Sequence, residues 1–298
     1  MTADLRPTVS REALAAFLAE RLGGPVEALR PVRPGELARV FAFELASQGR
    51  IVRLAFDGAG FEADRLAHER FAVHGLPIPR VLEIGRFGDL WYAVSERLPG
   101  RIMLGLPGEE YDRALPALLA LHDRIAAIEL GPGAGWLGPD GRGSHPSWAA
   151  FLTSIADQDA PGFWHGWRRL FETTFLDREL WEELHRRFLD LVPLCPEERR
   201  LVHGDFGYDN VLVEGERVTA LLDWANAKVG DPLFDVAYLG FWSPRQADLL
   251  RSRYGTVPAY DHRVACYHLY FALDGLRFYA RAGRRESYDW LLERIETL

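Results

Sequence analysis

The feature that most constrains the fold is the segment LVHGDFGYDNVLVEGERVTALLDW, residues 201–224. Two short apolar runs, at 211–213 and 218–222, are separated by turn-forming residues at 214–217, a pattern typical of a β-hairpin. A hairpin brings the ends of its strands together, so Asn210 and Asp223 are expected to lie near each other. Asp205 precedes them in a polar loop. The segment therefore predicts carboxylate and amide groups gathered on a rigid hairpin.

The spacing of Asp205 and Asn210 is that of the catalytic loop of protein kinases. Phosphoryl transfer needs a carboxylate beside the attacking hydroxyl and hard oxygen ligands for Mg²⁺. We expect Asp205 to take the proton of the acceptor hydroxyl, and Asn210 and Asp223 to bind the metal. The alternative is that all three are ordinary turn and strand-end residues, positions that Asp and Asn favour.

Polar residues around this segment are expected to support it. His203 is interpreted as a brace that holds the loop by hydrogen bonds, and Asp209 as either a second brace or a solvated turn residue. Asp231, directly before Pro232, is typical of a helix N-cap. Asp235, inside that helix, is placed to accept hydrogen bonds from the loop backbone.

Three motifs follow in order: H-G-D-x-x-x-x-N-x-L at 203–212, a strand ending in D-W at 223–224, and G-D-P-x-x-D-x-A at 230–237. Together they resemble the aminoglycoside phosphotransferase family, whose fold is protein-kinase-like, and within it the hygromycin B phosphotransferases. LPIPRVLEIGRF at 76–87 is similar as well. The resemblance implies ATP or GTP as co-substrate, Mg²⁺ as cofactor, and transfer of phosphate to a hydroxyl of a cationic aminoglycoside antibiotic, conferring resistance.

The order of expected elements gives an α+β fold of two lobes. A small antiparallel sheet with one packed helix is expected over 1–97 as the N-terminal nucleotide-binding lobe, and a hinge over 98–100. A mainly helical lobe with the catalytic loop and the acceptor site is expected over 101–298. The first helix should begin after Ser10 and end at Gly23. Later helices are expected over 164–192, 232–242, 245–254, 260–282 and 286–297.

The nucleotide side departs from the kinase pattern, which places a lysine on the third strand. Lys228 is the only lysine of the chain and lies in the other expected lobe, whereas Arg53 stands at the matching strand position. An arginine there can hold phosphate oxygens with its bidentate fork. Its acidic partner on the following helix is either Glu69 or Asp64. The alternative is that Arg53 is only an exposed strand residue.

Two further segments are expected to contact the nucleotide. Backbone groups of Glu96 and Leu98, at the hinge, should face the adenine. The loop at 33–40 should cover the phosphates, although its single glycine makes it an ordinary turn by itself.

Composition limits the other partners. The net charge of −8 and pI near 5.6 argue against binding of nucleic acid. No apolar run reaches the ~18–20 residues of a membrane helix, and the N-terminal sequence lacks the features of a signal peptide. Cys195 and Cys266 lie far apart and are expected to be reduced thiols. We therefore expect a cytoplasmic monomer without nucleic-acid or membrane partners.

A cationic acceptor should meet carboxylates of the helical lobe. The candidates, which on surface helices are often merely solvated, are Asp157, Asp159, Asp261, Asp274, Glu286 and Asp289. Two other functions stay open. One is a kinase of the same fold acting on a sugar, an amino alcohol or a macrolide, and the other is a nucleotide-binding protein without transfer activity.

Overall fold

The computed structural model describes residues 6–32, 35, 37–159 and 162–296. Within them the chain forms two compact units. The sheet unit comprises the chain up to Arg124 together with Tyr208–Ala225, and the helical unit comprises Ile125–Gly207 and the chain from Asn226 onward. The expected phosphate loop at 33–40 lies partly outside the described residues. Among the described helices, none has the length and apolar character needed to cross a membrane.

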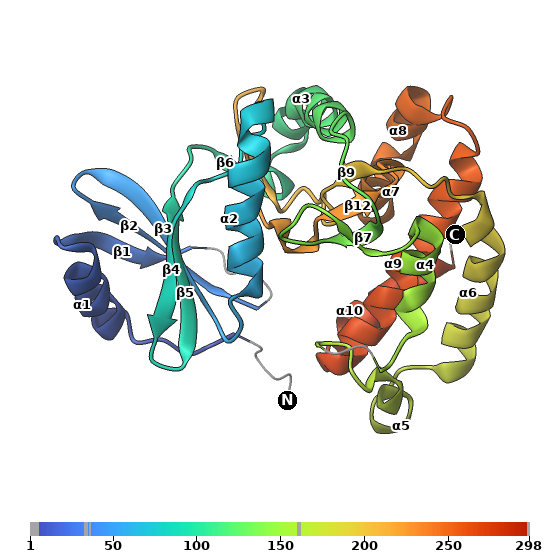
Figure 1. The fold of residues 1–298 in the computed structure, drawn as a ribbon, viewed down its shortest axis with the longest axis horizontal. Coiled ribbons are helices and arrows are strands. Elements are labelled where there is room, and N and C mark those ends of the chain that lie inside the picture. The colour runs from blue at the N-terminus through green and yellow to red at the C-terminus, as the bar shows by residue number, and fades with distance from the viewer. Residues whose placement is uncertain (1–5, 33–34, 36, 160–161, 297–298) are drawn as a thin grey trace. The chain divides into compact units, whose positions relative to one another are not determined.

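The sheet unit is built on five antiparallel strands in the order β1-β2-β3-β5-β4 (Figure 1). They are β1 (Val26–Pro31), β2 (Arg39–Leu45), β3 (Gln48–Ala55), β4 (Val81–Phe87) and β5 (Leu90–Glu96). Because side chains alternate along a strand, Val52 and Leu54 of β3 face one side of the sheet, and Arg53 faces the other. Helix α1 (Arg11–Leu22) packs on the first face and α2 (Ala59–Phe71) on the second.

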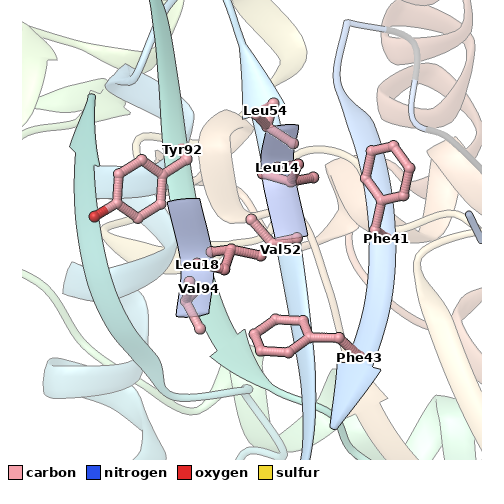
Figure 2. Packing of buried hydrophobic residues seen from close by; sticks show 8 residues of the cluster. All are labelled: Leu14, Leu18, Phe41, Phe43, Val52, Leu54, Tyr92 and Val94. Atoms are coloured by element: carbon pink, nitrogen blue, oxygen red, sulfur yellow. The ribbon is translucent and has the colours of Figure 1, made fainter. Parts of the chain in front are cut away.

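The core between α1 and the sheet fixes the position of β3. Figure 2 shows Leu14 and Leu18 of α1 among buried side chains of three strands, namely Phe41, Phe43, Val52, Leu54, Tyr92 and Val94. As predicted, α1 begins after Ser10, whose side chain accepts the N–H of Ala13, and ends at Gly23, with φ 71°. Strand pairing places Arg53 opposite Val40 on β2 and Ala93 on β5.

The predicted hairpin forms a second small sheet of the sheet unit, in the order β11-β10-β6. Strand β10 (Val211–Glu214) pairs with β11 (Arg217–Leu221) and with β6 (Arg101–Ile102). The hydroxyl of Thr219 on β11 donates to the carbonyl of Pro99 at 2.5 Å. Gly100 has φ 116°, and a Cβ there would lie 2.6 Å from Thr219 Oγ1. The expected hinge at 98–100 therefore packs against the hairpin. The two compact units divide after Arg124 and not at 98–100. The division into a nucleotide-binding lobe and an acceptor lobe stays a prediction.

The helical unit contains a four-stranded sheet in the order β8-β7-β12-β9. Its strands are β7 (Ala134–Leu137), β8 (Gly143–His145), β9 (Arg200–Val202) and β12 (Lys228–Gly230). Helix α3 (Gly108–Ala126) precedes this sheet. The helices of the unit are α4 (Trp148–Thr153), α5 (Leu170–Thr173), α6 (Arg178–Leu191), α7 (Leu233–Trp242), α8 (Ala247–Tyr254), α9 (Tyr260–Arg281) and α10 (Arg285–Ile295). Helix α9 packs against α6, α7 and α10 and is the central helix of this unit (Figure 1).

The single helix predicted over 164–192 is wrong. Gly166 adopts a left-handed conformation with φ 64°, and Thr174 is extended, so a 3-10 turn at Trp167–Arg169 and the short α5 form between them. Helix α6 starts afresh at Arg178, where the side chain of Asp177 accepts the N–H of Leu180 at 3.0 Å. The helical periodicity of the segment therefore conceals two breaks, and Asp177 is the cap that marks the second. The later helices α7, α8, α9 and α10 lie where they were predicted.

Candidate active site

An ion pair between Arg53 and Asp64 joins β3 to α2. The side chain of Arg53 is only 21% exposed, so Arg53 is not merely a solvated strand residue. Asp64 lies on the buried face of α2 with Phe61 and Ala67, one turn before and after it. Glu69 lies on the exposed face of the same helix. Of the two candidate partners, the structure therefore pairs Arg53 with Asp64 and not with Glu69.

Asp64 also holds the backbone that follows Asp223. Its Oδ1 accepts the N–H of Trp224 at 2.7 Å. Asp223 has φ 61°, a left-handed conformation that Asp tolerates better than most residues. Burial acts to lower the pKa of Arg53, but the charges of Asp64 and Asp223 outweigh it and raise that pKa. Arg53 therefore keeps its positive charge in the electrostatic field of Asp223.

The hairpin brings the backbone of Asn210 next to that of Asp223, as predicted. The N–H of Leu222 donates to the carbonyl of Asn210 at 2.8 Å, which extends the ladder in which Val211 lies opposite Leu221. Mg²⁺ accepts amide and carboxylate oxygens and usually keeps phosphates and waters as its other ligands. The described residues contain no group of three or more His, Cys, Asp or Glu able to hold a metal. The side chains of Asn210 and Asp223 carry the oxygen types that Mg²⁺ accepts, and their binding of the metal stays a prediction.

Glu96 and Leu98 lie at the end of β5 and just beyond it, and both are half-buried. The N–H of Glu96 donates to the carbonyl of Arg80 at 3.0 Å. The backbone group that Glu96 can offer to an adenine is therefore its carbonyl. Contact of either residue with a nucleotide stays a prediction.

Asp205 belongs to the helical unit, on the loop that follows β9. The carboxylate of Asp235 on α7 accepts the N–H of His203 at 2.7 Å and that of Gly204 at 2.8 Å. His203 is fully buried, and its Nδ1 accepts the N–H of Asp205 at 3.3 Å. The bracing roles predicted for His203 and Asp235 are confirmed, whereas Asp209 is exposed. The backbone immediately before Asp205 is thus fixed by buried hydrogen bonds.

Lys228, on β12, lies next to Gly204 of this loop. This position of Lys228 was not predicted from the sequence. Gly204 has φ 79°, and a Cβ there would lie 2.3 Å from Lys228 Nζ and 2.0 Å from the carbonyl oxygen of Asn226. The ammonium donates to that carbonyl at 2.6 Å. It also lies over the rings of Trp136 and Phe234, at 4.3 and 5.3 Å from their centroids. Only glycine fits at position 204, because the buried lysine and the carbonyl fill the space below it.

The surroundings of Lys228 lower the pKa of its ammonium group. Burial lowers its pKa to about 8, although Asp235, Asp205 and Asp274 act to raise it. The only sequence signal for this residue is that the single lysine of the chain stands in a short apolar stretch, A-K-V-G. Its aromatic neighbours come from distant segments, so the sequence could not show what surrounds it.

Asp231 binds the start of α7, although Pro232 and not Asp231 occupies the N-cap position of the helix. Its Oδ1 accepts the N–H of Leu233 at 2.9 Å. It is fully buried and forms an ion pair with Arg263 of α9, whose Nε donates to Oδ2 at 2.9 Å. This pair fixes the start of α7, and hence Asp235, against α9.

Most of the carboxylates proposed for the acceptor are engaged within the helical unit. Asp261, Asp274 and Asp289 each form an ion pair with an arginine. Asp157 accepts the N–H of Asp159 at 2.8 Å. A cationic acceptor would have to compete with the arginines for the first three, which makes them weak candidates.

Three features are typical of kinase-like phosphotransferases. They are the antiparallel sheet with its arginine–aspartate pair, the hairpin with Asn210 and Asp223, and the loop of Asp205 that a helix supports. The model of the phosphotransferase enzyme family matches residues 28–269 of the chain. The hygromycin-B 4-O-kinase of Escherichia coli is 32% identical over 302 residues, which cover 98% of this chain and 86% of that protein. The chain therefore belongs to the phosphotransferase enzyme family.

Solved structures agree with this assignment. A thermostable variant of aminoglycoside phosphotransferase APH(4)-Ia, in ternary complex with AMP-PNP and hygromycin B, matches with a TM-score of 0.85 at 32% identity, covering 96% of this chain and 97% of that one. A GDP complex of an aminoglycoside 2'-phosphotransferase-IIIa variant, at 18% identity and a TM-score of 0.66, shares the fold. The predicted family, the two-part kinase-like fold and the phosphotransferase class of the enzyme are confirmed.

Proposed function

We propose that this protein transfers the γ-phosphate of ATP or GTP to a hydroxyl of an aminoglycoside antibiotic, with hygromycin B as the first acceptor to test, and thereby confers resistance. The observation that carries the proposal is the network of Arg53, Asp64 and the Trp224 N–H, which places the Asp223 end of the hairpin beside a buried cation. Kinase-like phosphoryl transfer uses a phosphate-binding cation and a metal-binding carboxylate, and Arg53 and Asp223 would supply them.

The proposal assigns a role to each of the site residues. Asp205 accepts the proton of the attacking hydroxyl and orients that hydroxyl. Arg53 contacts phosphate oxygens of the nucleotide, and Glu96 and Leu98 face its base. Asn210 and Asp223 hold Mg²⁺, which when bound neutralises charge on the transferred phosphate. Catalysis is then mainly positioning and charge neutralisation.

The choice of substrates rests on the relatives. The E. coli relative is named for phosphorylation of hygromycin B, and the similar structure holds AMP-PNP with hygromycin B. These names favour hygromycin B as acceptor and ATP as phosphate donor. GTP stays open, because the more distant 2'-phosphotransferase has been crystallised with GDP.

The acceptor is tested by nucleotide turnover across a panel of aminoglycosides, with ATP and GTP, and with Mg²⁺ present and chelated. Hygromycin B should stimulate turnover, and chelation should abolish it. Turnover only with a sugar, an amino alcohol or a macrolide would replace the antibiotic by another hydroxyl compound. Nucleotide binding without turnover on any acceptor would contradict transfer activity.

The base is tested by Asp205→Ala. Loss of a general base should lower kcat about 10²–10⁴-fold, while calorimetric binding of nucleotide is retained. A variant with the wild-type rate would show that another group accepts the proton.

A further inference from the structure

Helix α7 contacts the catalytic loop at two points. Asp235 accepts the N–H groups of His203 and Gly204, and Tyr238, one turn later, donates its hydroxyl to Oδ1 of Asp205 at 2.5 Å. All of these residues belong to the helical unit. The first contact fixes the loop backbone, and the second reaches the carboxylate itself.

The ring of Tyr238 is held by its neighbours. It packs edge-on against Phe271 of α9, with ring centroids 5.1 Å apart, and lies 6.0 Å from Trp242 on its own helix. Aromatic contacts of this kind fix ring orientation. The hydroxyl is therefore presented to Asp205 by a packed ring on a buried helix, which is the rigid support that a positioned base requires.

A phenol that donates to a carboxylate forms a charge-assisted hydrogen bond, which limits rotation of the carboxylate and favours its ionised form. We propose that Tyr238 is a positioning residue for the phosphotransfer reaction, which orients the Asp205 carboxylate toward the acceptor hydroxyl. The proposal rests on the assignment of Asp205 as the base. The sequence did not indicate it, since the contact joins a loop to a helix 33 residues away.

Other charged groups also act around Asp205. Lys228 on β12 interacts electrostatically with Asp205, with Asp235 on α7 and with Asp274 on α9. His203 precedes Asp205 in the loop and receives its N–H. None of these groups is removed when the Tyr238 hydroxyl is deleted, so a change in pH dependence on deletion reports on that hydroxyl.

The experiment uses Tyr238→Phe in the full-length protein, because phenylalanine keeps the ring and removes only the hydroxyl. With the acceptor that supports turnover, kcat should fall about tenfold, since an oriented hydrogen bond to a charged group is lost. Nucleotide KM should stay within twofold of wild type. The acid limb of the kcat profile should move toward higher pH, because a hydrogen bond that favours the ionised carboxylate is lost.

Tyr288→Phe is the matched control. It removes a phenol oxygen that accepts the N–H of Asp177 at 3.1 Å, in the same unit but away from the loop. This control should keep the wild-type kcat and pH profile. Melting temperatures of the two variants separate a loss of stability from a loss of positioning.

Two results would overturn the role of Tyr238. One is a Tyr238→Phe enzyme with the wild-type kcat and pH profile, and the other is an equal fall in kcat for Tyr288→Phe. If Asp205→Ala is inactive while Tyr238→Phe is normal, only the inference fails. If Asp205→Ala retains the wild-type rate, the proposed base fails first.

Discussion

The segments of the two carboxylates proposed for catalysis, Asp223 and Asp205, are supported in the same way, each by a buried aspartate on a helix. In the sheet unit, Asp64 accepts the N–H of Trp224, directly after Asp223. In the helical unit, Asp235 accepts the N–H groups of the two residues directly before Asp205. Both supporting carboxylates are buried, with exposed fractions of 6% and 0%.

The difference lies in the cation beside each aspartate. Arg53 forms a direct ion pair with Asp64, whereas Lys228 donates to a backbone carbonyl and lies over aromatic rings. The pKa of Arg53 is accordingly raised despite burial, and that of Lys228 is lowered by burial to about 8. The comparison teaches that a carboxylate in contact compensates for the burial of a cation, and that carboxylates at longer range do so only in part.

The largest expected effect comes from the two supporting aspartates. Asp235→Asn should lower the free energy of unfolding by about 3 kcal/mol, because an amide cannot accept both buried N–H groups as the carboxylate does. Asp64→Asn should cost about 2 kcal/mol, since Arg53 retains some contact with water. Denaturant unfolding at pH 7 measures both.

Kinetics should separate the same two variants. Asp235→Asn acts on the loop of Asp205 and should lower kcat, whereas Asp64→Asn releases Arg53 and should raise the nucleotide KM. Identical kinetic defects in both variants would show that the two aspartates do not support separate functions.

The next effect concerns Lys228→Met. Below pH 8 the folded wild type buries a charged ammonium, and burial lowers the pKa of that group to about 8 from an ordinary 10.5. Between about pH 8 and 10.5 the folded lysine loses its proton before the unfolded one does, so wild-type stability rises relative to the variant. The stability of the wild type relative to Lys228→Met should therefore rise between about pH 8 and 10.5, by up to about 3 kcal/mol.

Because Lys228 is the only lysine in the chain, this pH dependence has a single source among the lysines. Lys228→Arg is the matched control, because arginine stays charged throughout the range. A difference in stability between wild type and Lys228→Met that does not change between pH 7 and 10.5 would mean that Lys228 titrates normally.

Much of the site could be predicted because its signals are local. Asp205, Asn210 and Asp223 stand on one loop and one hairpin, so spacing and turn residues were enough to relate Asn210 to Asp223. The caps of α1 are likewise contained within a few residues. Local hydrogen bonding determines such features, and the sequence displays it directly.

What could not be predicted depends on contacts between distant segments. Tyr238 reaches Asp205 only because α7 packs beside the loop, and Lys228 is surrounded by rings from β7 and α7. Periodicity also misled over 164–192, where apolar spacing continues across the break at Thr174. Tertiary packing decides these cases, and one sequence does not reveal it.

The smallest expected effect tests which acidic residue of α2 serves Arg53. Glu69 and Asp64 lie on opposite faces of the helix, and only Asp64 contacts the guanidinium. Glu69→Gln should change the free energy of unfolding by less than about 0.5 kcal/mol, as exposed substitutions usually do, and should leave nucleotide KM within twofold of wild type. Asp64→Asn, measured in parallel, should raise that KM clearly more. An equally large rise in nucleotide KM for Glu69→Gln and Asp64→Asn would contradict this assignment. Glu69 would then act on Arg53 as strongly as Asp64 does, although only Asp64 forms the ion pair.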